Sequence, residues 1–167
     1  MMNLYQRLGY LVLGSRLRRI SESFLSEINR AYQQEGIEFD ASWFPVFYLL
    51  SQHDTLSIKE LSEQIEVSHP AASQLIASLK NKGLLTSTTD AADGRKQQVT
   101  FTPKGRELLA RIKPVWEAVE HSMNEMMDTE LGCKELLPAI KALETALQSY
   151  PLANRISRNI SNKKSKP

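Results

Sequence analysis

The sequence predicts a mainly α-helical protein with a small β wing, in which a winged helix-turn-helix is flanked by long helices from both ends of the chain. Apolar residues recur at spacings of three and four along most of the 167 residues, which is the period of an amphipathic helix. Near the middle, two short helical segments are separated only by a tight turn, as in a helix-turn-helix pair. Two β-prone runs, 84–89 and 97–101, then flank a polar loop and predict a hairpin.

The first predicted helix begins near Leu4, reaches about Gln34 and is closed by Gly36. Such a long apolar stripe exceeds what one small core needs. Residues 1–36 are therefore expected to pack against a partner helix, for which a second copy of the chain is one source. The apolar positions are Leu4, Leu8, Leu11, Leu13, Leu17, Ile20, Phe24 and Ile28.

Residues 40–105 form the predicted reading unit. Either Asp40 or Ser42 can cap its first helix, and Pro45 fits the first turn, where a missing N–H does least damage. The next helix opens at Ser57, because the Ser57 hydroxyl and the Glu60 carboxylate can each satisfy a backbone donor in a capping box.

The second helix of the pair follows a turn at Val67. Ser68 can cap it, and Gly83 can take the left-handed conformation that ends it. The inward positions are Ala72, Leu75, Ile76 and Leu79. The positions that then face outward near the start of the helix are His69, Pro70, Ala71, Ser73 and Gln74.

The C-terminal third of the chain predicts two more helices and a tail. Thr102 and Pro103 are a cap followed by proline, and a last helix covers about 136–147 until Tyr150 and Pro151 stop it. We expect residues 106–150 to supply dimerisation helices. Residues 151–167 are basic and poor in apolar groups, and are predicted to be disordered.

The charge distribution says more than the formal net charge of +2. Residues 80–106 carry six Lys or Arg against two Asp, and residues 151–167 carry five with no acid. Local positive potential of this kind attracts polyanions. No apolar run approaches the roughly 20 residues that span a bilayer, and the opening residues lack a secretory-signal pattern, so we expect a cytoplasmic protein with no membrane partner.

Enzyme activity is not expected from this sequence. His53, His69 and His121 are scattered without metal-ligand spacing, and no phosphate-binding glycine loop or nucleophile elbow occurs. No metal or cofactor is expected. The single cysteine, Cys133, excludes an intrachain disulfide; a small residue at a helix start is the main interpretation, and redox sensing the alternative.

The middle of the chain resembles the MarR family of bacterial winged helix regulators. The resemblance covers about Trp43 to Gly105 and rests on 61–68, 79–85, Asp93-Gly94-Arg95 and the Thr-Pro-Lys-Gly of 102–105. It implies a homodimeric regulator of transcription. In similar proteins a small, often aromatic effector binds between the dimer helices and the reading unit, and repression is the commoner outcome.

The recognition helix would enter the major groove of double-stranded DNA. There Gln74 can bond adenine, Ser73 suits several bases or a phosphate, and Pro70 and Ala71 can pack on thymine methyl groups. Two half-sites about one helical turn apart, in a pseudo-palindromic site, require a two-fold dimer. The helices from Leu8 to Ile28 and from Leu136 to Leu147 are the expected dimer surface.

The hairpin would contact the neighbouring groove. Arg95 at its tip can enter the minor groove, while Asp93 either holds Arg95, as the resemblance favours, or caps the turn. Phosphate contacts are expected from Ser57, Lys80, Lys82 and Lys96, and Ser68 is grouped with the DNA-facing residues. The effector candidates are Arg16, Trp43, Tyr48 and Trp116.

A protein-interaction module that uses the same fold without binding DNA is the alternative from a different class. It predicts that the charges of Lys80, Arg95 and Lys96 are dispensable.

Overall fold

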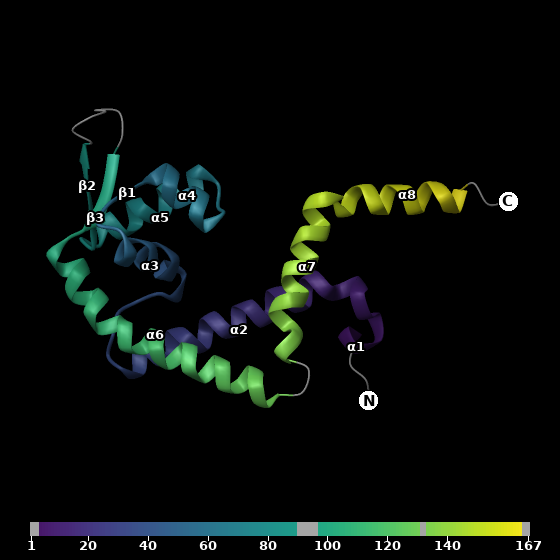
Figure 1. The fold of residues 1–167 in the computed structure, drawn as a ribbon, viewed down its shortest axis with the longest axis horizontal. Helices are drawn as coiled ribbons and strands as arrows, with labels where there is room; N and C mark the ends of the chain where they lie inside the picture. The colour runs from purple at the N-terminus through teal and green to yellow at the C-terminus, as the bar shows by residue number, and fades with distance from the viewer. Residues whose placement is uncertain (1–3, 90–96, 131–132, 165–167) are drawn as a thin grey trace. The chain divides into compact units, whose positions relative to one another are not determined.

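The computed structural model describes residues 4–89, 97–130 and 133–164 (Figure 1). It divides into two compact units, residues 1–119 and residues 120–167, and each is described by itself. In this part of the chain, no helix is long and apolar enough to cross a membrane.

The N-terminal helix is interrupted, which corrects the prediction of one continuous helix. Helix α1 covers Leu4–Leu8, a 3-10 turn η1 covers Gly9–Val12, and α2 covers Leu13–Gln34. The break is at Gly9, whose φ of 53° lies in the left-handed region that glycine tolerates best. As a result the Arg19 guanidinium lies 4.6 Å from the centre of the Tyr5 ring, whereas a straight helix would separate these positions by about 21 Å.

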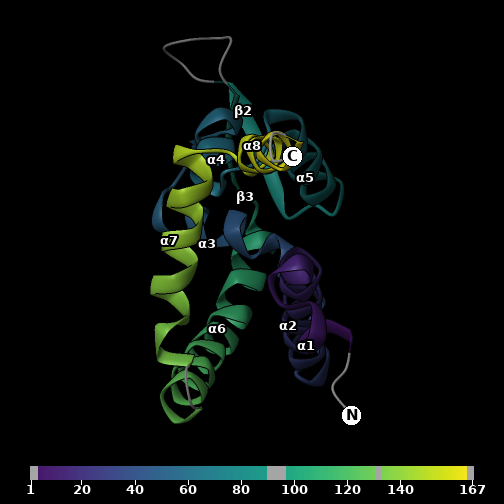
Figure 2. The ribbon, with the colours of Figure 1, turned by 90° about the vertical axis from the view of Figure 1, so that its right-hand side faces the viewer.

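The winged helix-turn-helix follows in the predicted order. Asp40, not Ser42, is the first cap: its carboxylate accepts from the Ser42 N–H at 2.8 Å. In both views the three central helices gather around the small sheet (Figure 2). The elements are η2 Ala41–Trp43, α3 Phe44–Gln52, β1 Leu56–Ser57, α4 Ile58–Ile65, α5 His69–Asn81, β2 Leu85–Thr89 and β3 Gln97–Phe101.

The sheet has three strands in the order β1-β3-β2, where the sequence predicted two. Strands β2 and β3 are antiparallel, with Leu85 opposite Phe101 and Thr89 opposite Gln97. The unpredicted strand β1 pairs Leu56 with Val99 on the other edge of β3. This pairing joins the start of α4 to the hairpin. The strand that leads into the helix pair and the two strands of the wing therefore belong to the same sheet.

The core of the first unit is built around Phe47 on α3. Its ring lies 5.0 Å from that of Phe39 and 4.9 Å from that of Phe101, which joins the segment after α2 to the sheet. The predicted inward residues of α5 are buried, except Leu75, which is half-buried. The largest fully buried side chains are Tyr32, Val46, Phe47, Leu61, Ile76, Leu79, Val99 and Ile112.

Helix α6, Pro103–Thr129, begins as predicted. The Thr102 hydroxyl accepts from the Gly105 N–H at 3.0 Å and donates to the Gly83 carbonyl at 2.7 Å. Gly105 has no room for a side chain, because a Cβ there would overlap with the carbonyl oxygen of Leu84. The first turn of α6 therefore packs directly on the backbone that enters β2.

The second unit contains the end of α6, a 3-10 turn η3 Cys133–Glu135, α7 Leu136–Ser149 and α8 Leu152–Lys164. Helix α7 ends before Tyr150, as predicted. The prediction of a disordered tail is wrong for residues 152–164, which form α8. The sequence contains the reason: Leu152, Ile156 and Ile160 recur every four residues, which is helical spacing.

Candidate nucleic-acid interface

The turn between α4 and α5 sets the direction of the recognition helix. Helix α4 ends at Ile65, the capping residue Glu66 has a left-handed φ of 59°, and the Val67 N–H donates to the Ser62 carbonyl at 3.1 Å. Ser68 then caps α5 as predicted, accepting from the Ala71 N–H at 3.4 Å. The left-handed Glu66 was not foreseen, because glycine is the usual residue there.

The first turn of α5 is exposed while its opposite face is buried. His69, Pro70, Ala71 and Gln74 are exposed, whereas Ala72 retains only 2% of its surface. The buried face packs against α4 and β2 and leaves the polar face outward. This is the arrangement required of a helix that inserts one face into the major groove.

Ser73 differs from the expectation of a fully outward residue. It is half-buried, and its hydroxyl oxygen lies 3.4 Å from Nδ1 of His69, one helical turn earlier. Gln74 is exposed, and the described residues give its amide no hydrogen-bond partner. Gln74 is therefore the side chain of this turn whose donor and acceptor are both available to a base.

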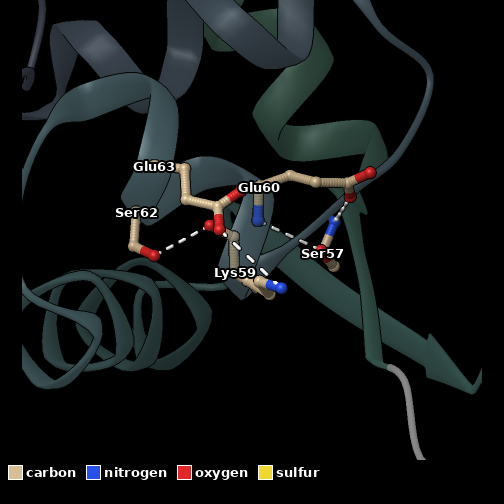
Figure 3. A network of polar contacts seen from close by, with 5 residues as sticks. All are labelled: Ser57, Lys59, Glu60, Ser62 and Glu63. Carbon is tan, nitrogen blue, oxygen red and sulfur yellow. Dashed lines mark hydrogen bonds and ion pairs between the residues drawn. The ribbon is translucent and has the colours of Figure 1, made fainter.

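Ser57 works first as a helix cap. Its hydroxyl accepts from the Glu60 N–H at 3.2 Å, and the Glu60 carboxylate accepts from the Ser57 N–H at 2.7 Å (Figure 3). The predicted capping box is thus confirmed. Nearby, the Ser62 hydroxyl donates to the Lys59 carbonyl, and the Lys59 ammonium lies 3.8 Å from Glu63. The Ser57 hydroxyl proton can still be donated to a phosphate.

Lys80 connects the recognition helix to the wing. It lies in the last turn of α5, and its ammonium donates to the Ser87 hydroxyl on β2 at 3.0 Å. The ammonium retains two further protons for an anion. Asp93, Arg95 and Lys96 lie outside the described residues, so their predicted roles remain predictions.

Lys82 is oriented by an aromatic ring. Its ammonium lies 5.2 Å from the centre of the Trp43 ring, and the Lys104 ammonium donates to the Lys82 carbonyl at 3.0 Å. These residues line a groove of about 870 Å³ between the loop after α2, the end of α5 and the start of α6. Phe39, Glu107 and Arg111 also line it, and Arg111 donates to the Gly36 carbonyl at 2.9 Å.

Of the four effector candidates, the structure brings together Tyr48 and Trp116, whose ring centres lie 6.1 Å apart. Phe44, which sequence reasoning missed, lies 5.0 Å from Trp116 and 5.5 Å from Tyr48. Its spacing of four residues from Tyr48 on α3 was the available signal. Trp43 lies in the groove with Lys82, and Arg16 is an exposed residue of α2 with no ring contact among the described residues.

The aromatic group of Phe44, Tyr48 and Trp116 is hydrogen-bonded, through Trp116, to the buried Tyr32. The Trp116 indole N–H donates to the Tyr32 hydroxyl at 2.9 Å. Burial raises the pKa of the Tyr32 hydroxyl above its ordinary value, and the hydrogen bond from Trp116 opposes that shift. Tyr32 is the second residue at this place that sequence reasoning did not single out.

Comparison with known proteins finds one family model and several transcriptional regulators that are similar to this chain. The model of the MarR family matches residues 38–96. The transcriptional regulator BilQ of Clostridioides difficile is 30% identical over 108 residues, which cover 61% of this chain and 72% of BilQ. The transcriptional regulator SarZ of Staphylococcus saprophyticus is 25% identical over 113 residues, covering 66% of this chain and 77% of SarZ.

The fold matches solved structures as well. The Staphylococcus aureus MepR–DNA complex superposes with a TM-score of 0.65 at 20% identity, over 82% of this chain and 96% of MepR. At that identity the match shows a shared fold.

Proposed function

The chain belongs to the MarR family, and from this premise we propose that it regulates transcription by binding double-stranded DNA as a homodimer. The observation that carries the proposal is the exposed first turn of α5, held by the Ser68 cap, beside a wing that is hydrogen-bonded to the same helix. BilQ and SarZ are named transcriptional regulators, and MepR was solved on DNA, which supports the proposal.

In this proposal α5 reads bases. Gln74 bonds adenine with its amide oxygen and nitrogen, and His69 and Ser73, which lie within 3.4 Å of each other, face a base edge or a phosphate together. Pro70 and Ala71 pack on thymine methyl groups. Ser57 and Ser68 contact backbone phosphates and position the helix without specifying sequence.

The wing contacts the neighbouring minor groove. We expect Arg95 to enter it, with Asp93 holding the guanidinium and Lys96 on a phosphate. Lys80 neutralises a second phosphate from the base of the wing. Replacing Arg95 by Ala should weaken specific binding by about 1–3 kcal/mol.

Dimerisation aligns two such surfaces. Helix α2 leaves an apolar stripe exposed, with Leu17 at 40%, Ile20 at 45% and Phe24 at 38%. Helix α7 leaves Leu143 and Leu147 similarly exposed. Burying these side chains between two chains is the driving force we propose, and two half-sites one helical turn apart would then be read together.

Effector control is proposed for the aromatic group of Phe44, Tyr48 and Trp116. An aromatic effector that stacks against these rings would shift α3 against α6, and with them the spacing of the two recognition helices. In this proposal the DNA-bound protein represses transcription, and binding of the effector releases the protein from DNA. Trp43 and Arg16 belong to this proposal only if the dimer brings them to the same place.

The test is a titration of a fluorescent duplex taken from the DNA upstream of the protein's own gene, at fixed salt. We expect binding much tighter than to a scrambled duplex. Gln74→Ala should lose about 1–3 kcal/mol of discrimination at one base pair in each half-site. The control is Gln148→Ala, an equivalent change on exposed α7.

One result would contradict the role of Gln74, and a second would contradict DNA binding as a whole. A selection experiment that returns the same motif for Gln74→Ala and the parent protein removes Gln74 from base reading. Equal, weak binding to both duplexes, unchanged when Lys80 and Arg95 are replaced, would favour the protein-interaction module instead.

A further inference from the structure

Helix α8 presents an apolar stripe that nothing in the described chain covers. Leu152, Ile156 and Ile160 are 55%, 50% and 52% exposed. Their spacing of four residues places them on one face of the helix. An isolated helix of 13 residues is marginally stable in water, so α8 needs a partner to persist.

Side-chain contacts of Arg155 and Arg158 hold the turn between α7 and α8. The Arg155 guanidinium donates to the carbonyl oxygens of Tyr150 at 2.9 Å and of Ala146 at 3.0 Å, and lies 5.0 Å from the centre of the Tyr150 ring. Arg158 lies 5.8 Å from the same ring. These contacts fix α8 to the C-terminal end of α7, so the stripe projects in a set direction from that end.

The charge of α8 selects an acidic partner. Residues 151–164 contain four Lys or Arg and no acid, a formal charge of +4. Residues 120–130, at the end of α6, contain Glu120, Glu125, Asp128 and Glu130 and no Lys or Arg, a formal charge of −4 with His121 neutral. All four acids are exposed, but Asp128 already lies 3.4 Å from the Lys134 ammonium of the same chain, so the charge offered to a partner is mainly that of Glu120, Glu125 and Glu130.

The end of α6 also offers apolar contact. Met123 and Met127 are half-buried and lie on the turns that carry Glu120 and Asp128. Methionine side chains adapt to irregular aliphatic neighbours. Asn124 lies between Glu120 and Asp128 at spacings of four, so it marks the middle of this acidic face.

We propose that α8 of one chain docks on the acidic end of α6, residues 120–130, of a second copy. Two α8 helices would repel each other, and a DNA backbone would match the charge but leave the aliphatic stripe uncovered. The same chain is a poorer partner, because Arg155 holds α8 at the far end of α7, about 21 Å along that helix from its junction with α6. The proposal requires self-association but does not require DNA binding.

The test is chemical cross-linking between two differently tagged, co-expressed chains in a Cys133→Ser background. One chain carries Ile160→Cys and the other Asn124→Cys, and a short bismaleimide joins thiols that lie close together. We expect a heterodimer band on a denaturing gel. The matched control replaces Ile160→Cys by Asn154→Cys, on the opposite face of α8, and should give little product.

The contribution of the acidic side chains is tested with the same pair of cysteine variants, Ile160→Cys and Asn124→Cys. Glu120→Gln with Glu125→Gln should weaken the association of α8 about tenfold and lower the cross-linking yield accordingly, whereas Glu38→Gln, an exposed position in the loop after α2, should not. An undiminished yield after neutralisation would overturn the proposal. So would a product formed within one chain that carries both cysteines.

Sedimentation of the same samples separates the two proposals. A dimer without the cross-link overturns the docking of α8 and leaves the proposed DNA-binding dimer intact. A monomer contradicts both. If removing residues 152–164 lowers the salt dependence of DNA binding, or abolishes binding to anionic phosphatidylserine vesicles, α8 has a different partner and the proposal is wrong.

Discussion

Substituting Ala for Gly105 tests the packing between α6 and the wing. Ala favours a helix over Gly by about 1 kcal/mol, so an unobstructed site would gain stability. At Gly105, however, the new Cβ would overlap with the Leu84 carbonyl oxygen and lie 3.0 Å from Cδ1 of Phe101. The Leu84 carbonyl already accepts from the Thr102 N–H at 3.1 Å, so it is not free to move.

The expected cost follows from these contacts. Overpacking costs about 1–3 kcal/mol, and backbone that cannot yield places Gly105→Ala at the upper end. After the gain in helix propensity, we expect a net loss of about 2 kcal/mol in the free energy of unfolding. In urea this moves the midpoint down by about 1 M.

The assay is urea unfolding followed by circular dichroism at a fixed protomer concentration, because the proposed dimerisation would make stability depend on concentration. The control is Gly14→Ala in α2, where no atom lies within 4 Å of the new Cβ. It should gain about 0.5–1 kcal/mol. If both variants are stabilised alike, the close approach of α6 to Leu84 is not a constraint and the reasoning fails.

Three further predictions concern single side chains. Ser57→Ala removes the cap of α4 and should cost about 0.5–2 kcal/mol of unfolding free energy; an unchanged urea midpoint would contradict the capping role. The raised pKa of Tyr32 means that its neutral form stabilises the fold below pH 10, and that this stability is lost as pH rises through the folded-state pKa. Tyr32→Phe should therefore flatten the alkaline loss of stability. Trp116→Phe removes the hydrogen bond that opposes the shift, so it should raise the pKa of Tyr32 further in a spectrophotometric titration. Lys80→Gln should reduce the salt slope of DNA binding by about one charge while Ser87→Ala leaves it unchanged; equal slopes for all three proteins would remove Lys80 from the phosphate contacts.

The central part of the fold could be predicted because its signals are local. The capping residues Ser57 and Ser68 and the terminating Gly83 each satisfy or release backbone groups within a few residues, so their chemistry is readable from sequence. The buried faces of α4 and α5 follow the same short-range periodicity.

The missed elements depend on distant partners or on weak patterns. Strand β1 has two residues, too few for any alternation, and exists because Val99 and Gln98 pair with it. A single glycine inside an apolar helical pattern is usually tolerated, so Gly9 gave no warning of a break. The stripe of α8 has only three aliphatic residues among basic ones, which resembles the composition of a disordered segment.

The candidate interface was predictable in its parts but not in its internal contacts. That Gln74 faces outward follows from helical period, whereas the approach of Ser73 to His69 depends on rotamers. Trp43 packs edge-on against Phe39, with ring centres 5.4 Å apart, whereas Tyr48 and Trp116 contact each other. Tertiary contacts of this kind leave no mark at a fixed sequence spacing.

The attachment of the hairpin to the helix pair has a consequence for how the protein would leave DNA. Lys80 ties α5 to β2, Leu56 ties α4 to β3, and Thr102 ties the start of α6 to the backbone before β2. Any tilt of α6 therefore moves α5, the proposed base-reading helix, together with the hairpin, the proposed contact to the DNA backbone. Release should be abrupt, with both grooves vacated in one step and no long-lived intermediate that holds the duplex by the hairpin alone.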